Sequence, residues 1–236
     1  MDKIAKQQLN VIILVDTSKS MQGKRISQVN MALRDINTHL TEMQDENANV
    51  EFCITVIPFS NDAVFLNGDK SKPIEGFDFK DLKGGGWSNL HLAYDKLFDI
   101  LKKESKGGIM PDFGGVAPII LLMTDGHPTK YPLKKEMERL QSLPWFKVAL
   151  KYGISIMHND ELTRKVLDEF VSGNGDVIDC LDASLLKKII QIVVLTASKV
   201  KSTTTAIGVS TNQGVKNVQI VQQVRQALNE VDDWEW

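Results

Sequence analysis

Two uninterrupted apolar runs, each followed by a carboxylate, constrain the fold of this chain more than any other feature. The run Val11–Val15 leads directly into Asp16, and the run Pro118–Met123 is followed one residue later by Asp125. Short apolar runs of this kind are typical of strands that are buried on both faces of a parallel sheet. Open α/β sheets place their ligand sites outside the carboxyl ends of the strands, so both acids are expected at one edge of such a sheet.

Strand-like and helix-like patterns alternate along residues 1–200, which predicts one doubly wound, Rossmann-like α/β domain with a mainly parallel sheet. One antiparallel edge strand is expected at Ala63–Leu66, because a turn-forming Ser-Asn-Asp sequence precedes it. The other strands are expected at residues 9–15, 50–59, 116–123, 146–150 or 154–157, and 177–180. Helices are expected at residues 26–40, 90–103, 133–143, 161–171 and 183–200.

Hydroxyl groups accompany the acids at this predicted edge. Ser18 and Ser20 follow Asp16 at alternate positions, and Ser88 follows three consecutive glycines, Gly84–Gly86, just before a helical pattern. Glycines allow a backbone to approach an ion closely, and hydroxyl and carboxylate oxygens are ligands for hard divalent cations. The alternative is that Ser18 and Ser20 only cap the following helix.

The ordered set of Asp16-Thr17-Ser18-Lys19-Ser20, the glycine-rich loop with Ser88, and Thr124-Asp125-Gly126 resembles the metal-ion-dependent adhesion site of von Willebrand factor type A domains. The resemblance covers roughly residues 8–198 and implies that domain's fold. It also implies that one Mg²⁺ or Mn²⁺ is bound, with Ser18 and Ser20 as direct ligands. The complete implied ligand set is Asp16, Ser18, Ser20, Ser88 and Asp125.

The glycine-rich loop departs from the commoner family pattern, in which a Thr occupies the position of Ser88. A hydroxyl is retained, so metal binding is expected to survive. The preceding residue, Trp87, is either a packing anchor for the loop or an exposed contact at the rim of the site. We expect the packing role, because large aromatic side chains are mostly buried.

The segments Val11–Met21 and Leu121–Thr129 are similar to those of bacterial tellurite-resistance-associated, TerY-like type A proteins. Close relatives in that group are encoded beside a protein kinase and a phosphatase. The resemblance therefore implies an adaptor in a stress or defence system, with a kinase or phosphatase as a possible class of partner. Lys130 stands in the region where such relatives often carry an acid.

An ion held mainly by hydroxyls and water-linked acids stays electrophilic, so a protein partner's Asp or Glu can complete its coordination. Specificity is then expected from the surrounding loops at residues 19–24, 84–89 and 127–130. The alternative function is a metal-dependent hydrolase or phosphatase. The chain lacks the GxSxG, GxxxxGK[ST] and HExxH motifs, and no base is evident beside the ligands, so we do not expect an enzyme. The four histidines are interpreted as ordinary polar residues.

The formal net charge of −2 gives no reason to expect nucleic acid or an anionic membrane as a partner. No apolar run is long enough for a membrane span, and we expect a cytoplasmic protein with buried, reduced Cys53 and Cys180. Residues 201–236 are expected to be a linker and an acidic, aromatic tail ending in Asp232–Trp236. This tail is either a passive terminus or a docking peptide that also permits self-association.

Overall fold

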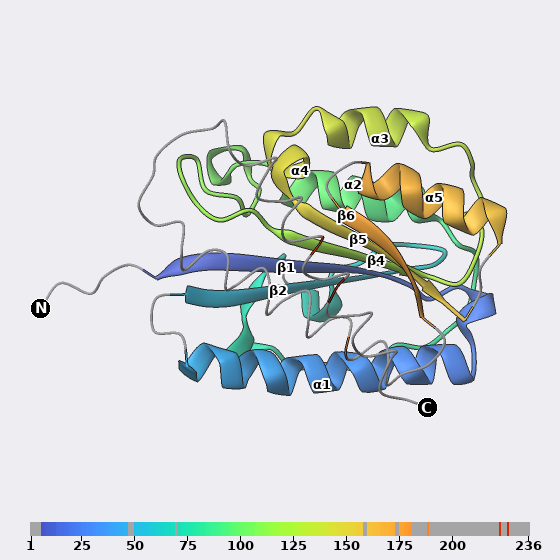
Figure 1. The fold of residues 1–236 in the computed structure, drawn as a ribbon, viewed down its shortest axis with the longest axis horizontal. Helices are drawn as coiled ribbons and strands as arrows, with labels where there is room; N and C mark the ends of the chain where they lie inside the picture. The colour runs from blue at the N-terminus through green and yellow to red at the C-terminus, as the bar shows by residue number, and fades with distance from the viewer. Residues whose placement is uncertain are drawn as a thin grey trace, which may run out of the picture.

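The computed structural model describes residues 6–46, 50–68, 70–157, 160–172 and 175–180, together with the isolated residues 188, 222 and 226. The expected helix at 183–200, the tail at 201–236 and His158 lie outside the described residues, apart from those isolated positions. Within these ranges the chain forms a sheet with helices on both faces (Figure 1). No helix in the described ranges combines the length and the apolar character that crossing a membrane requires.

Six strands make up the sheet, in the spatial order β3-β2-β1-β4-β5-β6. Every neighbouring pair is parallel except β2 and β3, which are antiparallel. The predicted doubly wound, mainly parallel α/β fold with one antiparallel edge strand is therefore confirmed. The strands are β1 (Gln7–Asp16), β2 (Val50–Phe59), β3 (Lys72–Pro73), β4 (Ile119–Thr124), β5 (Leu150–Ile156) and β6 (Gly175–Cys180).

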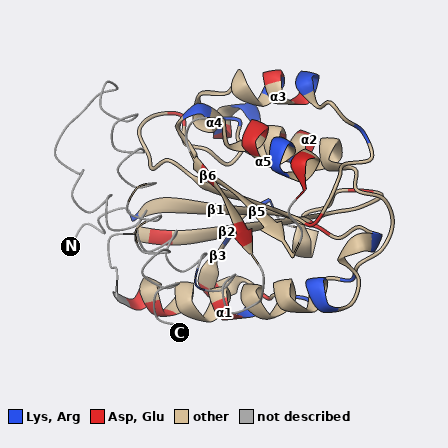
Figure 2. Ribbon diagram, turned by 45° about the vertical axis from the view of Figure 1, so that its right-hand side comes forward, with Lys and Arg blue, Asp and Glu red and all other residues tan. Residues whose placement is uncertain are grey.

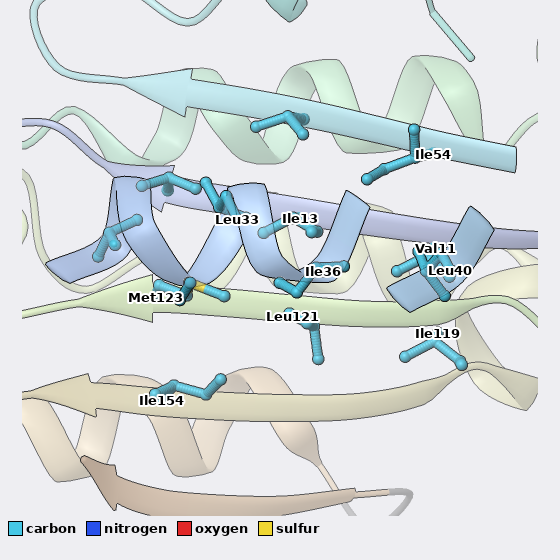
Figure 3. Close-up of a cluster of buried hydrophobic side chains, with 14 of the residues drawn as sticks. Val11, Ile13, Leu33, Ile36, Leu40, Ile54, Ile119, Leu121, Met123 and Ile154 are labelled. Carbon is cyan, nitrogen blue, oxygen red and sulfur yellow. The ribbon is translucent and has the colours of Figure 1, made fainter. Parts of the chain in front are cut away.

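Two layers of helices cover the sheet: among the helices that the structure describes, α1 lies on one face and the other four lie on the opposite face (Figure 1). Side chains alternate between the faces of a strand, so β1 supplies Val11 and Ile13 to the α1 side and Ile12 and Leu14 to the other. Figure 3 shows the first of these layers, in which Leu33, Ile36 and Leu40 of α1 lie over the strands. The helices are α1 (Lys24–Glu46), α2 (Leu90–Ile100), α3 (Lys134–Gln141), α4 (Pro144–Val148) and α5 (Glu161–Val171).

The two strands that were predicted to end at the site, at residues 9–15 and 116–123, are confirmed as β1 and β4, although β4 begins only at Ile119. The register pairs Val15 of β1 with Met123 of β4, so Asp16 and Thr124 end their strands at the same level. Asp16 also pairs with Phe59 at the end of β2. The carboxyl ends of three adjacent strands therefore meet at one edge of the sheet.

The predicted position of the antiparallel edge strand was wrong. Ala63 makes only an isolated antiparallel bridge to Phe59, and the chain then passes through a short 3₁₀ turn, η2 (Leu66–Gly68). The edge strand is β3, where Pro73 and Lys72 pair with β2. A two-residue edge strand that contains proline has no hydrophobic pattern by which it could be recognised.

Of the two alternatives for the next strand, Phe146–Leu150 was placed wrongly, whereas Ile154–Met157 overlaps the end of β5 (Leu150–Ile156). Residues 144–148 form the short helix α4, because Pro144 starts a helix readily, and the strand β5 begins at Leu150. Gly153 lies inside β5 rather than ending it. A Cβ at this position would lie 2.9 Å from Cβ of Leu167 in α5, so the helix packs directly on the glycine. Cys53 and Cys180 are free and buried, as expected.

Candidate metal site

Asp16 joins three segments that are distant in the sequence. Its Oδ1 accepts a hydrogen bond from the backbone N–H of Ser18 at 2.8 Å. Its Oδ2 accepts from the hydroxyls of Ser88 and Thr124, each also at 2.8 Å. The end of β1, the start of the α2 segment and the end of β4 are thus held together by one buried carboxylate.

A second set of contacts connects the remaining predicted residues. The hydroxyl oxygens of Ser18 and Ser20 lie 3.0 Å apart, and the Ser20 hydroxyl donates to Oδ1 of Asp125 at 2.8 Å. The structure therefore brings all the predicted side chains into one hydrogen-bonded cluster. These are Asp16, Ser18, Ser20, Ser88 and Asp125.

The helix-capping interpretation of the two serines was wrong. Ser18 occupies the N-cap position of the 3₁₀ turn η1 (Lys19–Met21), but its side chain makes no capping hydrogen bond. The Ser20 hydroxyl points to Asp125, across the sheet edge, rather than to the backbone of α1. Both hydroxyls face the acids of the cluster.

Thr124 is a member of the cluster that was not predicted from the sequence. It is buried at the last position of β4, and its hydroxyl contacts both Asp16 and the backbone of Gly126. The signal was present, because a threonine between an apolar strand and an acid places a hydroxyl at the same sheet edge. Only the register of β1 and β4 shows that this hydroxyl reaches Asp16.

The protonation of Asp16 depends on a competition between burial and hydrogen bonding. Burial raises the pKa of this carboxyl, while donors on Ser18, Thr124 and Ser88 lower it. Burial prevails, so the pKa lies above the ordinary value for Asp. A cation bound beside Asp16 would stabilise the ionised form of this carboxyl.

Asp125 has an oxygen that suits a cation. Its Oδ2 is buried and accepts no hydrogen bond, although Nη1 of Arg25 lies 3.1 Å away. The same Nη1 donates to the backbone carbonyl of Ser20 at 3.0 Å. Within the described ranges, no group of three or more His, Cys, Asp or Glu side chains could hold a metal ion. The cluster instead combines two carboxylates with hydroxyls, and this all-oxygen set fits a hard divalent cation.

The glycine-rich loop is tied to the DxSxS segment by backbone hydrogen bonds. Gly85 N–H donates to the carbonyl of Thr17 at 2.8 Å, and Lys19 N–H donates to the carbonyl of Gly86 at 3.0 Å. Gly86 has a φ of 82°, and a Cβ there would lie 2.6 Å from Oδ1 of Asn61. A side chain at this position would therefore be strained and would clash, which explains the need for glycine beside Ser88.

The expectation that Trp87 packs into the protein was wrong. Trp87 is 69% exposed, although its backbone N–H is fixed by a 2.8 Å hydrogen bond to Oδ1 of Asn61. Trp87 therefore stands at the surface, one residue from the buried Ser88.

His127, two residues beyond Asp125, is engaged by another acid. Its Nε2 lies 2.7 Å from Oδ1 of Asp160, the residue that caps α5. Burial opposes ionisation of Asp160, but donors on Thr163, His127 and Leu162 outweigh it and hold the pKa of this carboxyl below its ordinary value. His127 is therefore held by Asp160, at the start of α5.

Replacing Arg25 by Gln is expected to separate the stability of the metal-free protein from its metal response. The guanidinium is the cation beside the buried Asp125 carboxylate, so its loss should lower the free energy of unfolding without metal by about 1 kcal/mol or more. Metal affinity should rise severalfold, because the guanidinium no longer repels the ion.

Thermal unfolding with Mg²⁺ and with chelator measures both effects of this change. Arg34→Gln is a matched control, because Arg34 pairs with an exposed acid, Asp81, away from the site. The metal-induced rise in Tm should be larger for Arg25→Gln than for the wild type and for Arg34→Gln. Equal rises in all three proteins would contradict a role for Arg25 at the metal site.

Comparison with known families identifies the class to which this fold and site belong. The von Willebrand factor type A domain model matches residues 10–191, so the chain belongs to this family. Domains of this family are often metal-dependent protein-interaction modules with a metal-ion-dependent adhesion site that binds a divalent metal. Comparison with curated proteins finds no match.

Solved structures share the fold at low sequence identity. A von Willebrand factor type A protein from Catenulispora acidiphila is 14% identical, with a TM-score of 0.56 over 81% of this chain and 43% of that one. Proximal thread matrix protein 1 from the mussel byssus, in a form with a zinc-occupied adhesion motif, is 18% identical, with a TM-score of 0.55 over 82% and 48%. The chain spans less than half the length of these two structures.

Proposed function

We propose that this chain is a metal-dependent protein-binding module, an adaptor that captures an Asp or Glu carboxylate of a protein partner through one bound Mg²⁺ or Mn²⁺. The observation that carries the proposal is the single hydrogen-bonded cluster that links Asp16, Ser18, Ser20, Ser88 and Asp125 at the carboxyl edge of the sheet. Membership of the type A family supports it.

Ser18 and Ser20 would hold the ion directly, with Asp16, Asp125 and Ser88 beside them or in contact through water. The ion supplies an electrophilic position for an incoming carboxylate oxygen. Thr124 serves this set by donating to Asp16 from the side of β4. Since these donors are all oxygens, Mg²⁺ and Mn²⁺ are favoured over the softer Zn²⁺, which is the metal in the mussel protein.

Binding without turnover is favoured over metal-dependent hydrolysis or phosphoryl transfer. Such a reaction needs a base that can reach a water molecule near the ion. His127 is the nearest histidine in sequence to the cluster, and its Nε2 is already bound to Asp160. Oδ2 of Asp125, which accepts no hydrogen bond, lies 3.1 Å from Nη1 of Arg25.

The biological setting is proposed from sequence resemblance. The DxSxS and TDG segments support a cytoplasmic adaptor in a bacterial stress or defence system, with a kinase or phosphatase among its partners. The acidic, aromatic tail at 230–236 offers a further carboxylate source, so self-association between copies is part of the proposal. Light scattering with Mg²⁺ and with chelator measures this association directly.

Capture of partners on the immobilised full-length chain tests the proposed function. Partners that bind through the ion should be retained in Mg²⁺, released by chelator, and absent with Asp16→Asn. The same preparation should turn over neither phosphopeptides nor nucleotides. Metal-dependent turnover that Asp16→Asn abolishes would favour the hydrolase instead, and partner capture that is indifferent to chelator would reject the carboxylate mechanism.

A further inference from the structure

The face around the metal site carries an exposed aromatic side chain on a rigid support. Trp87 lies next to Ser88, and the loop backbone around it is bonded to Asn61, to Thr17 and to Lys19. An anchored loop has little conformational freedom to lose when a partner binds, and exposed tryptophans are prominent among residues that dominate binding energy. Trp87 is therefore placed to contact whatever approaches the ion.

The segment that follows Asp16 and the segment that carries Trp87 are basic. These segments, at residues 17–25 and 83–89, are hydrogen-bonded to each other. They contain no Asp or Glu and four basic residues, Lys19, Lys24, Arg25 and Lys83. Arg25 is engaged by Asp125, whereas the three lysines are exposed and form no ion pair with the described residues. Figure 2 shows basic residues at the first turn of α1, on the side of the molecule where the strands end.

The charges of these lysines determine which type of side chain can pack against the Trp87 indole. An exposed tryptophan can attract either a cation or an apolar ring. Three exposed lysines on the same two segments repel a cationic segment and attract an acidic one. A segment that combines acidic residues with a neutral aromatic side chain can interact favourably with both the lysines and Trp87.

Resting on the proposed function, we propose that this face recognises an acidic peptide segment in which an aromatic residue adjoins the metal-binding carboxylate. Trp87 contacts the aromatic ring, and Lys19, Lys24 and Lys83 attract the neighbouring acids. Trp87 is thus a specificity-determining residue, while the metal cluster supplies the carboxylate preference. Residues 230–236, Glu-Val-Asp-Asp-Trp-Glu-Trp, have this composition, so the tail of a second copy is one segment of the required kind.

Labelled synthetic peptides test the inference by fluorescence anisotropy with the full-length chain in Mg²⁺ and in chelator. The probe is Gly-Glu-Asp-Trp-Glu-Gly, and the two comparison peptides replace its Trp by Ala or its Asp and both Glu by Asn and Gln. The wild type should bind the probe in Mg²⁺ about tenfold more tightly than the peptide without Trp. The peptide without acids should not bind.

Trp87→Ala should weaken binding of the probe about tenfold and leave binding of the peptide without Trp unchanged. Trp87→Phe should retain most of the affinity, because a ring remains. Phe113→Ala is the matched control, since Phe113 is also a highly exposed aromatic residue, in the loop before β4, and should have no effect.

The outcomes separate this inference from the proposed function. If both acidic peptides bind equally in Mg²⁺, or if Trp87→Ala weakens both equally, the aromatic specificity is wrong while the carboxylate function stands. If no acidic peptide binds in a metal-dependent manner, both proposals fail. A Mg²⁺-dependent increase in molecular mass that is lost both in Trp87→Ala and on deletion of residues 230–236 would support the inference and identify the tail of a second copy as an occupant.

Discussion

Replacing Asp16 by Asn is expected to lower the affinity for Mg²⁺ or Mn²⁺ by about 100-fold or more. Loss of an outer-shell partner of a metal ligand typically costs about 10–100-fold, and Asp16 in addition carries the charge at the centre of the cluster. Isothermal titration calorimetry on both proteins measures the change. Asp95→Asn is a matched control, because Asp95 pairs with Arg139 in a partly exposed ion pair.

Folding should survive this substitution. The amide oxygen of Asn can accept from Ser18 N–H, and the hydroxyls of Ser88 and Thr124 can rotate to accept from its amide group. A neutral side chain also avoids the cost of burying a charge, which is what raises the pKa of Asp16. The stability of the metal-free protein should therefore not fall. Equal metal affinities in the wild type and Asp16→Asn would show that the cluster is only structural.

The same carboxyl predicts the direction of the pH dependence. Because burial raises the pKa of Asp16, the metal-free protein retains this proton to a higher pH than an ordinary Asp does. Metal binding requires the ionised form, so affinity should fall as the pH drops through this raised pKa. Titrations at several pH values should show the loss in the wild type and a flatter profile in Asp16→Asn.

Ser88→Ala is expected to weaken partner binding by roughly 10- to 150-fold, whereas Ser88→Thr should be tolerated. The Ser88 hydroxyl donates to Asp16, and a hydrogen bond to a charged group contributes about 1.5–3 kcal/mol. Alanine leaves Asp16 Oδ2 with Thr124 as its remaining donor, while threonine retains a hydroxyl. Capture of a metal-dependent partner, or of the acidic peptide probe, measures the ranking.

Ser27→Ala is the control for a hydroxyl on the same side of the molecule, because Ser27 bonds only to the nearby Gly23 carbonyl at the start of α1. Metal affinity should fall less than partner affinity in Ser88→Ala, since the paired hydroxyls of Ser18 and Ser20 remain. Disruption by Thr together with a silent Ala substitution would mean that the loop at Trp87 holds Ser88 away from the ion.

The regular part of the sheet was predictable because it depends on local pattern. The apolar runs before Asp16 and Asp125 required burial on both faces, and parallel strands end at one edge, so both acids had to lie close together. Local pattern failed where packing supplied the missing context. Gly153 interrupts the apolar pattern of β5 but is accommodated because Leu167 of α5 lies against it. Lys151 is a second exception to the apolar pattern of β5, because it is charged when exposed and yet is buried in this strand. Burial lowers its pKa to about 8.

The sequence by itself determined most of the alternating strands and helices, the acids and hydroxyls of the site and their place at a sheet edge, because each depends on residue type and short-range spacing. Only the tertiary structure decided which atoms meet. Strand register brings the Thr124 hydroxyl to Asp16, and the first turn of α1 brings Arg25 to Asp125. Hydrogen bonds with the Thr17 carbonyl, the Lys19 N–H and the Asn61 side chain fix the glycine-rich loop, and Trp87 stands in solvent. Such contacts join residues far apart in the chain, and no short-range pattern encodes their distances.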